Sequence, residues 1–332
     1  FFSSRRRHTR YGTVTGVQTC ALPISTAGLA APQDRLARTA QALQSIKAMQ
    51  DAARAAATAS SVPNGLIAGG LQVNNAAPWT GAGAPQQTVA NGQTKVTIAQ
   101  NAPQAMLNWT TFNVGKETTL TFDQSLGGAD KRKWVAFNKV NDPAGVPSQI
   151  LGQIQAPGQV YVINANGIIF GGSAQINVNS LIASALPIND NLIARGLLNN
   201  PDTQFLFSAL PLAAGANGTP AFTPATPATP DGLPGDVTVQ AGAKITTPTT
   251  ADKLGGRVVL VGANVQNNGQ ISTPDGQTIL AAGLQVGFAA HSATDPALRG
   301  LDVYVGAISD PDRKSTRLNS SHSSVSRMPS SA

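Results

Sequence analysis

Residues 158–186 read GQVYVINANGIIFGGSAQINVNSLIASAL, and this stretch places two apolar runs on either side of a short polar corner. The runs are Gln159–Ile163 and Ile168–Phe170, and a third run follows at Gln175–Val178. Between the first two runs lie residues 164–167, three of which are Asn or Gly, the types that take a tight or left-handed backbone. The stretch therefore predicts short β-strands joined by a solvent-accessible corner.

Side chains alternate between the two faces of a strand, so Ile168 and Phe170 share one face, which we expect to point into the core. Asn164, Asn166 and Gly167 would then hold the corner, and the amide side chains could pair with neighbouring coils. Geometry alone leaves two readings of these residues open: a structural brace or a recognition site.

A weak repeat continues this pattern toward the C-terminus. Gly235, Gly256 and Gly276 each open a run rich in Val, Ile or Leu, and the steps between them are nearly equal. A second series of apolar residues recurs at nearly the same spacing, at Ile245, Val265 and Val286. A period of about 20 with several short strands is typical of a solenoid. A β-sandwich is also built from short strands, but it gives no reason for a constant step, so the pattern favours a parallel β-helix.

Side chains that could carry chemistry are scarce between residues 26 and 312. This stretch holds 15 of the 23 Lys and Arg and all 16 Asp and Glu, a net charge of −1 in a chain whose total is +7. A nearly neutral body gives no electrostatic footprint for nucleic acid or an anionic membrane. The single cysteine, Cys20, lies outside the stretch, which excludes disulfides and thiolate metal sites within it. We expect no cofactor and no metal.

A β-helical polysaccharide-degrading enzyme is the enzymatic alternative. Such an enzyme needs two carboxyls across a groove, or clustered carboxylates with a nearby base. The acids of this chain are scattered, and the basic run Lys131–Lys133 is typical of a solvated loop. His291 is the only histidine away from the ends, and the sequence fixes no partners for it. The sequence therefore predicts that the chain is not an enzyme.

The two ends differ in composition from the rest. Residues 1–25 and 310–332 are basic, lack periodicity and resemble translated sequencing-adapter read-through; the alternative is a disordered tail at each end. Residues 26–61 carry apolar side chains at helical spacing, which predicts an N-terminal amphipathic helix. No apolar run reaches the roughly 18 residues that span a bilayer, so we expect no stable membrane insertion.

Two β regions follow the helical segment, at residues 62–210 and 236–309. The residues between them, 211–235, read PLAAGANGTPAFTPATPATPDGLPG. Proline lacks the N–H that a strand donates, and the segment has few apolar anchors, so it is predicted to be a surface loop.

An ordered set of motifs carries a family resemblance. The four motifs are LNWTTFNVG at 107–115, ILGQI at 150–154, NANGI at 164–168 and NSLIAS at 179–184. Together they resemble the N-terminal secretion domain of filamentous haemagglutinin-family proteins, the exoproteins of two-partner secretion. The resemblance covers about residues 64–209 and continues at repeat level through 236–288. Ala165 stands where the family usually has proline.

The resemblance implies an all-β fold, a right-handed parallel β-helix (solenoid). It also implies a secretion motif made of Asn108, Phe112, Asn113, Asn164, Asn166, Gly167 and Ile168. The chain would be the secretion-targeting domain of a large filamentous adhesin of a Gram-negative bacterium, secreted or held at the cell surface.

The implied partner is an outer-membrane β-barrel transporter whose POTRA (periplasmic transport-associated) domains recognise the chain in the periplasm. The binding-class alternative is an adhesive module whose own surface contacts host glycan or protein, with a host-surface receptor as its partner.

Overall fold

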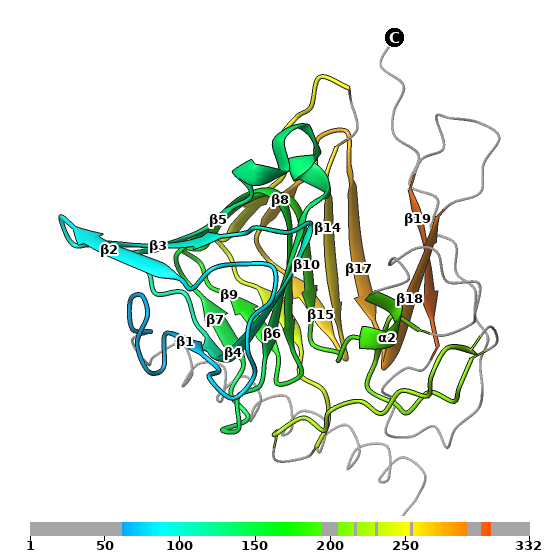
Figure 1. Cartoon of the computed structure of the whole chain (residues 1–332). Coiled ribbons are helices and arrows are strands. Elements are labelled where there is room, and N and C mark those ends of the chain that lie inside the picture. The colour runs from blue at the N-terminus through cyan, green and yellow to red at the C-terminus, as the bar shows by residue number, and fades with distance from the viewer. Residues whose placement is uncertain are drawn as a thin grey trace, which may run out of the picture. The chain divides into compact units, whose positions relative to one another are not determined.

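The computed structural model in Figure 1 describes residues 62–193, 205–215, 218–229, 232–252, 255–290 and 300–306. The chain divides into two units, Phe1–Ala57 and Thr58–Ala332, and every described residue belongs to the second. The predicted helix at 26–61, both predicted tails and His291 lie outside the described residues.

The described residues are mostly β, and most strand pairs are parallel. A first parallel stack begins at β3 and uses the N-terminal halves of two long strands, β8 and β10. Its members are β3 (Gln93–Ala99), β5 (Thr118–Asp123), β8 (Gln153–Asn164), β10 (Gln175–Ser184), β13 (Lys244–Thr246) and β16 (Gln270–Ser272).

A second parallel stack uses the C-terminal halves of the same two long strands. Its other members are β4 (Gln104–Phe112), β6 (Val135–Val140), β14 (Arg257–Gly262) and β17 (Gln277–Ala282). Because β8 and β10 run through both stacks, the two are joined into one sheet of 12 strands.

A third stack is a separate sheet of four parallel strands. Its members are β7 (Ser148–Ile150), β9 (Ile168–Phe170), β12 (Val237–Val239) and β15 (Val265–Asn267). Parallel stacking of this extent is unlike a β-sandwich, whose sheets are antiparallel.

Apolar side chains from all three stacks meet in one core. In the first stack, register places five fully buried residues opposite one another in succession: Val96, Leu120, Ile154, Ile176 and Ile245. Burying each such side chain stabilises the fold by about 1.5–3 kcal/mol relative to leaving it in water. The inward faces of these stacked strands therefore supply a continuous stabilising core.

Antiparallel strands and short helices surround the stacks. They are β1 (Leu71–Val73), β2 (Gln86–Ala90), β11 (Phe207–Ser208), β18 (Gln285–Ala290), β19 (Leu301–Val305), the 3₁₀ helix η2 (Ser125–Lys133) and α2 (Asp190–Ile193). Strand β2 forms a hairpin with β3 through Asn91 and Gly92, whose φ angles of +50° and +75° suit a two-residue hairpin turn.

The outer face of the second stack is also buried. A second apolar cluster joins Phe137, Tyr161 and Val259 on that face to residues of α2, β11, β18 and β19. The Phe137 and Tyr161 rings pack edge to face with centroids 4.8 Å apart, and burial raises the pKa of the Tyr161 hydroxyl. Burial on both faces explains why residues 160–163 form an unbroken apolar run.

The structure confirms part of the repeat and corrects the rest. Arg257 lies opposite Gln277, so the step from Gly256 to Gly276 is a true stacking step. Val237, by contrast, lies opposite Val265, which is a clearly longer step along the chain. Ile245 lies in the first stack, Val265 in the third stack and Val286 in the antiparallel sheet of β11, β18 and β19, so the three residues are not equivalent positions. The physical reason is that register follows the lengths of the connections, which vary from one turn of the chain to the next.

Candidate functional site

The motif corner joins the end of β8 to the start of β9. The Gly167 N–H donates to the Asn164 carbonyl at 2.9 Å, and the Asn166 N–H donates to Asn164 Oδ1 at 3.0 Å. Gly167 has a φ of +112°, in the region that favours glycine, and a Cβ there would lie 3.0 Å from the Asp236 carbonyl oxygen. The turn therefore depends on an amide side chain at its first position and on glycine at its last.

Both amide side chains of the corner bind neighbouring segments. Asn164 Nδ2 donates to Ser148 Oγ at 2.9 Å. Asn166 Nδ2 donates to the Asp142 carbonyl at 2.9 Å, and Asn166 Oδ1 accepts from the Ala228 N–H at 3.0 Å. Asn164 is 1% exposed and Asn166 is 8% exposed. The expectation of a solvent-accessible corner is wrong, because the segment that contains Ala228 lies over it.

The strand that leaves the corner points its apolar side chains inward, as the alternation predicts. Ile168 and Phe170 are both fully buried in the main core, and Ile168 lies opposite Val237 of the next strand in its stack. Tyr161 and Ile163, on the strand that enters the corner, lie in the second cluster instead.

The second predicted motif element lies at the end of β4. Asn108 is half-buried, and its Nδ2 donates to the Pro78 carbonyl at 3.2 Å. Phe112 is fully buried and packs edge to face on Trp109, with ring centroids 5.3 Å apart. Phe112 is therefore a core residue, whereas Asn108 ties β4 to the preceding loop.

Strand β7 links the two motif elements. Asn113 Oδ1 accepts from the Gln149 N–H at 2.7 Å, and Asn113 Nδ2 donates to the Gly69 carbonyl at 3.0 Å. Ser148, the neighbour of Gln149, binds Asn164 from the other element. One short strand is thus held by an asparagine from each element, although the two asparagines are well separated in the sequence.

One motif residue from each element lines a common cavity of about 360 Å³. Asn108 and Asn166 both line it, as does the half-buried Lys139, whose Nζ lies 2.7 Å from Asp190 Oδ2. Among its other lining residues are Asn141, Asp142, Ala165, Phe222, Thr223 and Ala228. The structure does not place Phe112, Asn113 or Ile168 in this lining.

Sequence reasoning missed three residues that hold the corner: Ser148, Asp142 and Ala228. Asp142 opens a turn with Pro143 and Gly145, a recognisable signal, but nothing in the sequence says that its carbonyl faces Asn166. Ala228 lies in the segment that was predicted to be a surface loop. Within the described part of 211–235, pairing is limited to a single bridge between Leu212 and Phe222.

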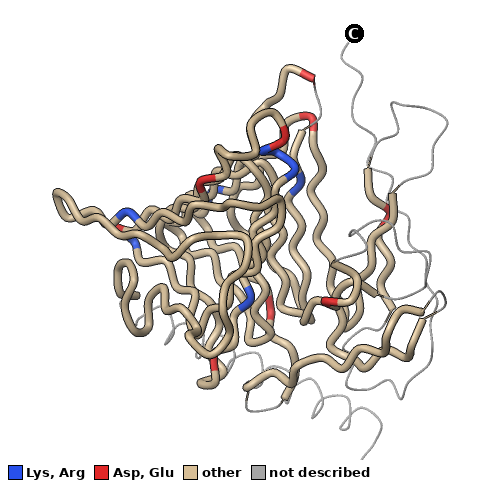
Figure 2. Tube along the Cα trace, viewed as in Figure 1, with Lys and Arg blue, Asp and Glu red and all other residues tan. Residues whose placement is uncertain are grey.

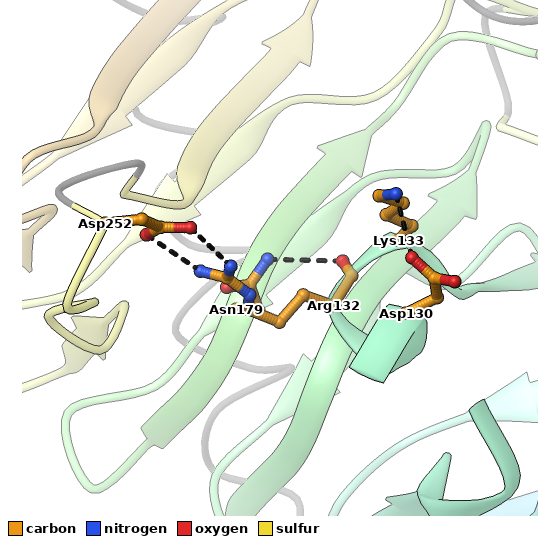
Figure 3. Close-up of polar contacts among 5 residues, drawn as sticks. All are labelled: Asp130, Arg132, Lys133, Asn179 and Asp252. Carbon is orange, nitrogen blue, oxygen red and sulfur yellow. Dashed lines mark hydrogen bonds and ion pairs between the residues drawn. The ribbon is translucent and has the colours of Figure 1, made fainter. Parts of the chain in front are cut away.

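The basic run Lys131–Lys133 ends η2 and is only partly the solvated loop that the sequence predicts. Arg132 binds Asp252 with two hydrogen bonds of 2.6 and 3.2 Å, and Asn179 Nδ2 donates to the Arg132 carbonyl at 3.3 Å (Figure 3). The Asp252 carboxylate raises the pKa of Arg132. Lys133 lies 2.8 Å from Asp130 and lowers the pKa of that carboxyl, which is largely exposed.

Charged residues elsewhere in the described part are scattered, mostly at loops and strand ends (Figure 2). Among the described residues, no three His, Cys, Asp or Glu side chains are grouped so that they could hold a metal ion. A search of the same residues finds no helix with the length and apolar character needed to cross a membrane.

Comparisons with known proteins give a family match over most of the chain. A family model described as the TPS (two-partner secretion) secretion domain matches residues 74–300. Two heme/hemopexin-binding proteins of Haemophilus influenzae are 38% and 37% identical to the chain over 90 residues. Those residues are 27% of this chain and 9% of each relative, so the chain matches less than a tenth of the relatives' length.

A solved structure, the secretion domain of HMW1 from Haemophilus influenzae, is also similar. It is 22% identical, with a TM-score of 0.46, over 73% of this chain and 50% of that chain.

Proposed function

The chain belongs to the TPS secretion domain family, and from this membership we propose that the corner between β8 and β9 takes part in recognition by a transporter. As a member of this family, the chain is the secretion domain of an exoprotein, which a two-partner system exports through the outer membrane. It is a non-catalytic targeting module, and its family implies an outer-membrane transporter as its partner.

The finer fold proposal is a right-handed parallel β-helix, preceded by an amphipathic helix at 26–61. The three parallel stacks would be its three faces, and the core ladder that runs through Ile154 and Ile176 would be its interior. Residues 62–210 would form the secretion domain and 236–309 further coils, with 211–235 inserted between them.

The proposed secretion motif comprises Asn108, Phe112, Asn113, Asn164, Asn166, Gly167 and Ile168. One observation carries this proposal: residues from both elements converge, on strand β7 and on a single cavity. The POTRA domains of the transporter would read the motif in the periplasm.

For the whole exported protein we propose a filamentous-haemagglutinin-like adhesin at the surface of a Gram-negative bacterium. The two relatives are named for binding heme and hemopexin, and such binding is the alternative for the remainder of the protein. An adhesive role for the described residues themselves has less support, because their strongly exposed apolar side chains include a single aromatic one, Tyr304.

Export and folding can be separated by a matched pair of variants. The double variant Asn164→Ala, Asn166→Ala leaves the Asp142 carbonyl and the Ala228 N–H without their partners, each at a cost of about 1–3 kcal/mol. The control is Leu260→Ala, a fully buried change on β14 with an expected cost of about 2–5 kcal/mol.

Both variants should refold to a β-rich state after dilution from urea. In cells that contain the partner transporter, we expect the control to reach the medium and the double variant to stay in the periplasm. Equal extracellular yields for the two variants, after correction for refolded content, would reduce the corner to a structural brace.

A further inference from the structure

The segment between β11 and β12 returns across the motif corner. We call Phe222–Ala228 the strap. Its last residue donates the Ala228 N–H to Asn166 Oδ1 at 3.0 Å, and its earlier residues line the cavity that Asn108 and Asn166 also line. The strap therefore occupies one side of the site on which the proposed function depends.

Contact between the strap and the corner region is close. Gly145 has a φ of +70°, and a Cβ at this position would lie 2.2 Å from the Ala228 carbonyl oxygen. No side chain fits there while the strap is in place. Downstream, the Gly235 N–H donates to the Ala165 carbonyl at 2.8 Å, and the Ile168 N–H donates to the Asp236 carbonyl at 2.9 Å.

The strap is nevertheless separate from the parallel stacks. Among the described residues, its only strand-like pairing is the bridge between Phe222 and Leu212, and it repeats the tripeptide Thr-Pro-Ala at 223–225 and 226–228. Few apolar anchors hold such a segment, so it can detach with a small fraction of the free energy of global unfolding. The stacking of β9 on β12 does not involve it.

We propose that the strap is an autoinhibitory latch, which closes over Asn166 and the cavity in the folded domain and makes the motif accessible to the transporter only when it is released. This inference rests on the proposed function of the corner. It adds a control element from outside the motif: access depends on the Ala228–Asn166 contact and on the absence of a side chain at Gly145.

The latch can be opened without changing the motif. Ala228→Pro removes the N–H that donates a hydrogen bond to Asn166 Oδ1, and it creates a Pro-Pro pair with Pro227. Ala225→Pro creates the same pair with Pro224 in the same strap, at an exposed residue, and is the matched control. Gly145→Ala places a Cβ against the Ala228 carbonyl oxygen and gives a second opening variant, which leaves the Ala228 N–H in place.

Accessibility is measured by thiol labelling at Ala165, a half-buried residue of the cavity lining. Each variant carries Ala165→Cys, and Cys20→Ser removes the only native cysteine. Ala228→Pro and Gly145→Ala should be labelled by a maleimide at least about 10-fold faster than the parent and the Ala225→Pro control, because the parent would open only as a minor state. Equal rates in all four chains would overturn the latch, and so would equal acceleration by both proline variants.

Recognition is measured by capture on detergent-solubilised transporter from cells that export the parent chain. The folded Ala228→Pro variant and the parent diluted from urea should both be captured about 10-fold more than the folded parent. Capture of the unfolded parent without capture of the rapidly labelled variant would overturn the latch and leave the proposed function intact. Capture of neither would overturn the proposed function, and the latch with it.

Discussion

Asn166 connects three segments through one residue. Its Nδ2 reaches the turn at Asp142, its Oδ1 reaches Ala228, and its backbone N–H closes the corner on Asn164. A buried amide whose NH2 group and carbonyl oxygen are both hydrogen-bonded is hard to replace, because few other side chains offer a donor and an acceptor at that spacing. The Asn-x-Asn-Gly pattern predicted a corner, but it could not reveal the two distant partners.

Ile168 provides a test of the register at residue scale. Ile168→Asp would place a charge among apolar side chains, since Ile168 is fully buried and the main core around it is apolar. We expect the free energy of unfolding, measured by urea denaturation, to fall by at least about 3 kcal/mol. Ile67→Asp, at a residue that is 54% exposed, is the control and should remain close to wild type. Parental stability of Ile168→Asp would show that the side chain does not point inward.

The positions of the strands could be predicted from the sequence better than the pairing of each strand with its partners in the sheet. The run at 168–170 is a complete strand, whereas the runs at 159–163 and 175–178 are parts of the longer strands β8 and β10, which continue through Gly158 and Asn179. Pairing was predicted less well, because Ile168 stacks on Val237, far along the chain and across a segment whose composition carries no pairing signal. The partners of Arg132 were missed for the same reason.

The Arg132–Asp252 pair gives a prediction at the scale of elements, since it ties η2 to the loop between β13 and β14. The two side chains are 41% and 39% exposed. At such exposure solvent screens the two charges, so the pair should contribute little to stability. Asp252→Asn should lower the midpoint of urea unfolding slightly in low salt, and the difference should shrink at about 1 M NaCl as screening increases.

Asp130→Asn is the matched control for that change. Asp130 pairs with Lys133 on the same short helix, and the Lys133 and Asp130 side chains are 82% and 66% exposed. Its effect should therefore be smaller. An unfolding midpoint of Asp252→Asn equal to that of the parent in low salt would mean that the contact between η2 and the β13–β14 loop adds nothing to stability.

At the scale of the whole molecule, stability should reside in the two apolar clusters that flank the second stack. The main core and the second cluster share the strands β6, β8, β10 and β14, one on each face. Residues 1–25 and 313–332 carry four basic residues each, no acidic ones and no apolar periodicity. Nothing in their composition suits them to either cluster.

Removal of these two ends should therefore leave the melting temperature unchanged within about 1–2 °C, below the shift of roughly 2–4 °C that a 1 kcal/mol change causes in a domain of this size. Differential scanning calorimetry of the full chain and of residues 26–312 provides the comparison. A drop of about 5 °C or more on truncation would contradict the prediction and assign the ends a structural role.

The sequence separations between the contacting residues of the corner determine the order in which its hydrogen bonds can form. Asn164 and its partner Ser148 lie 16 residues apart, whereas Asn166 and its partner Ala228 lie 62 residues apart. Loop-closure entropy makes the longer connection about 1 kcal/mol less favourable to close than the shorter one. In a chain that emerges from its N-terminus, β7 and β9 can pair as a half-built corner long before the covering residues arrive. The interval between these two events is set by the length of chain that separates Asn166 from Ala228.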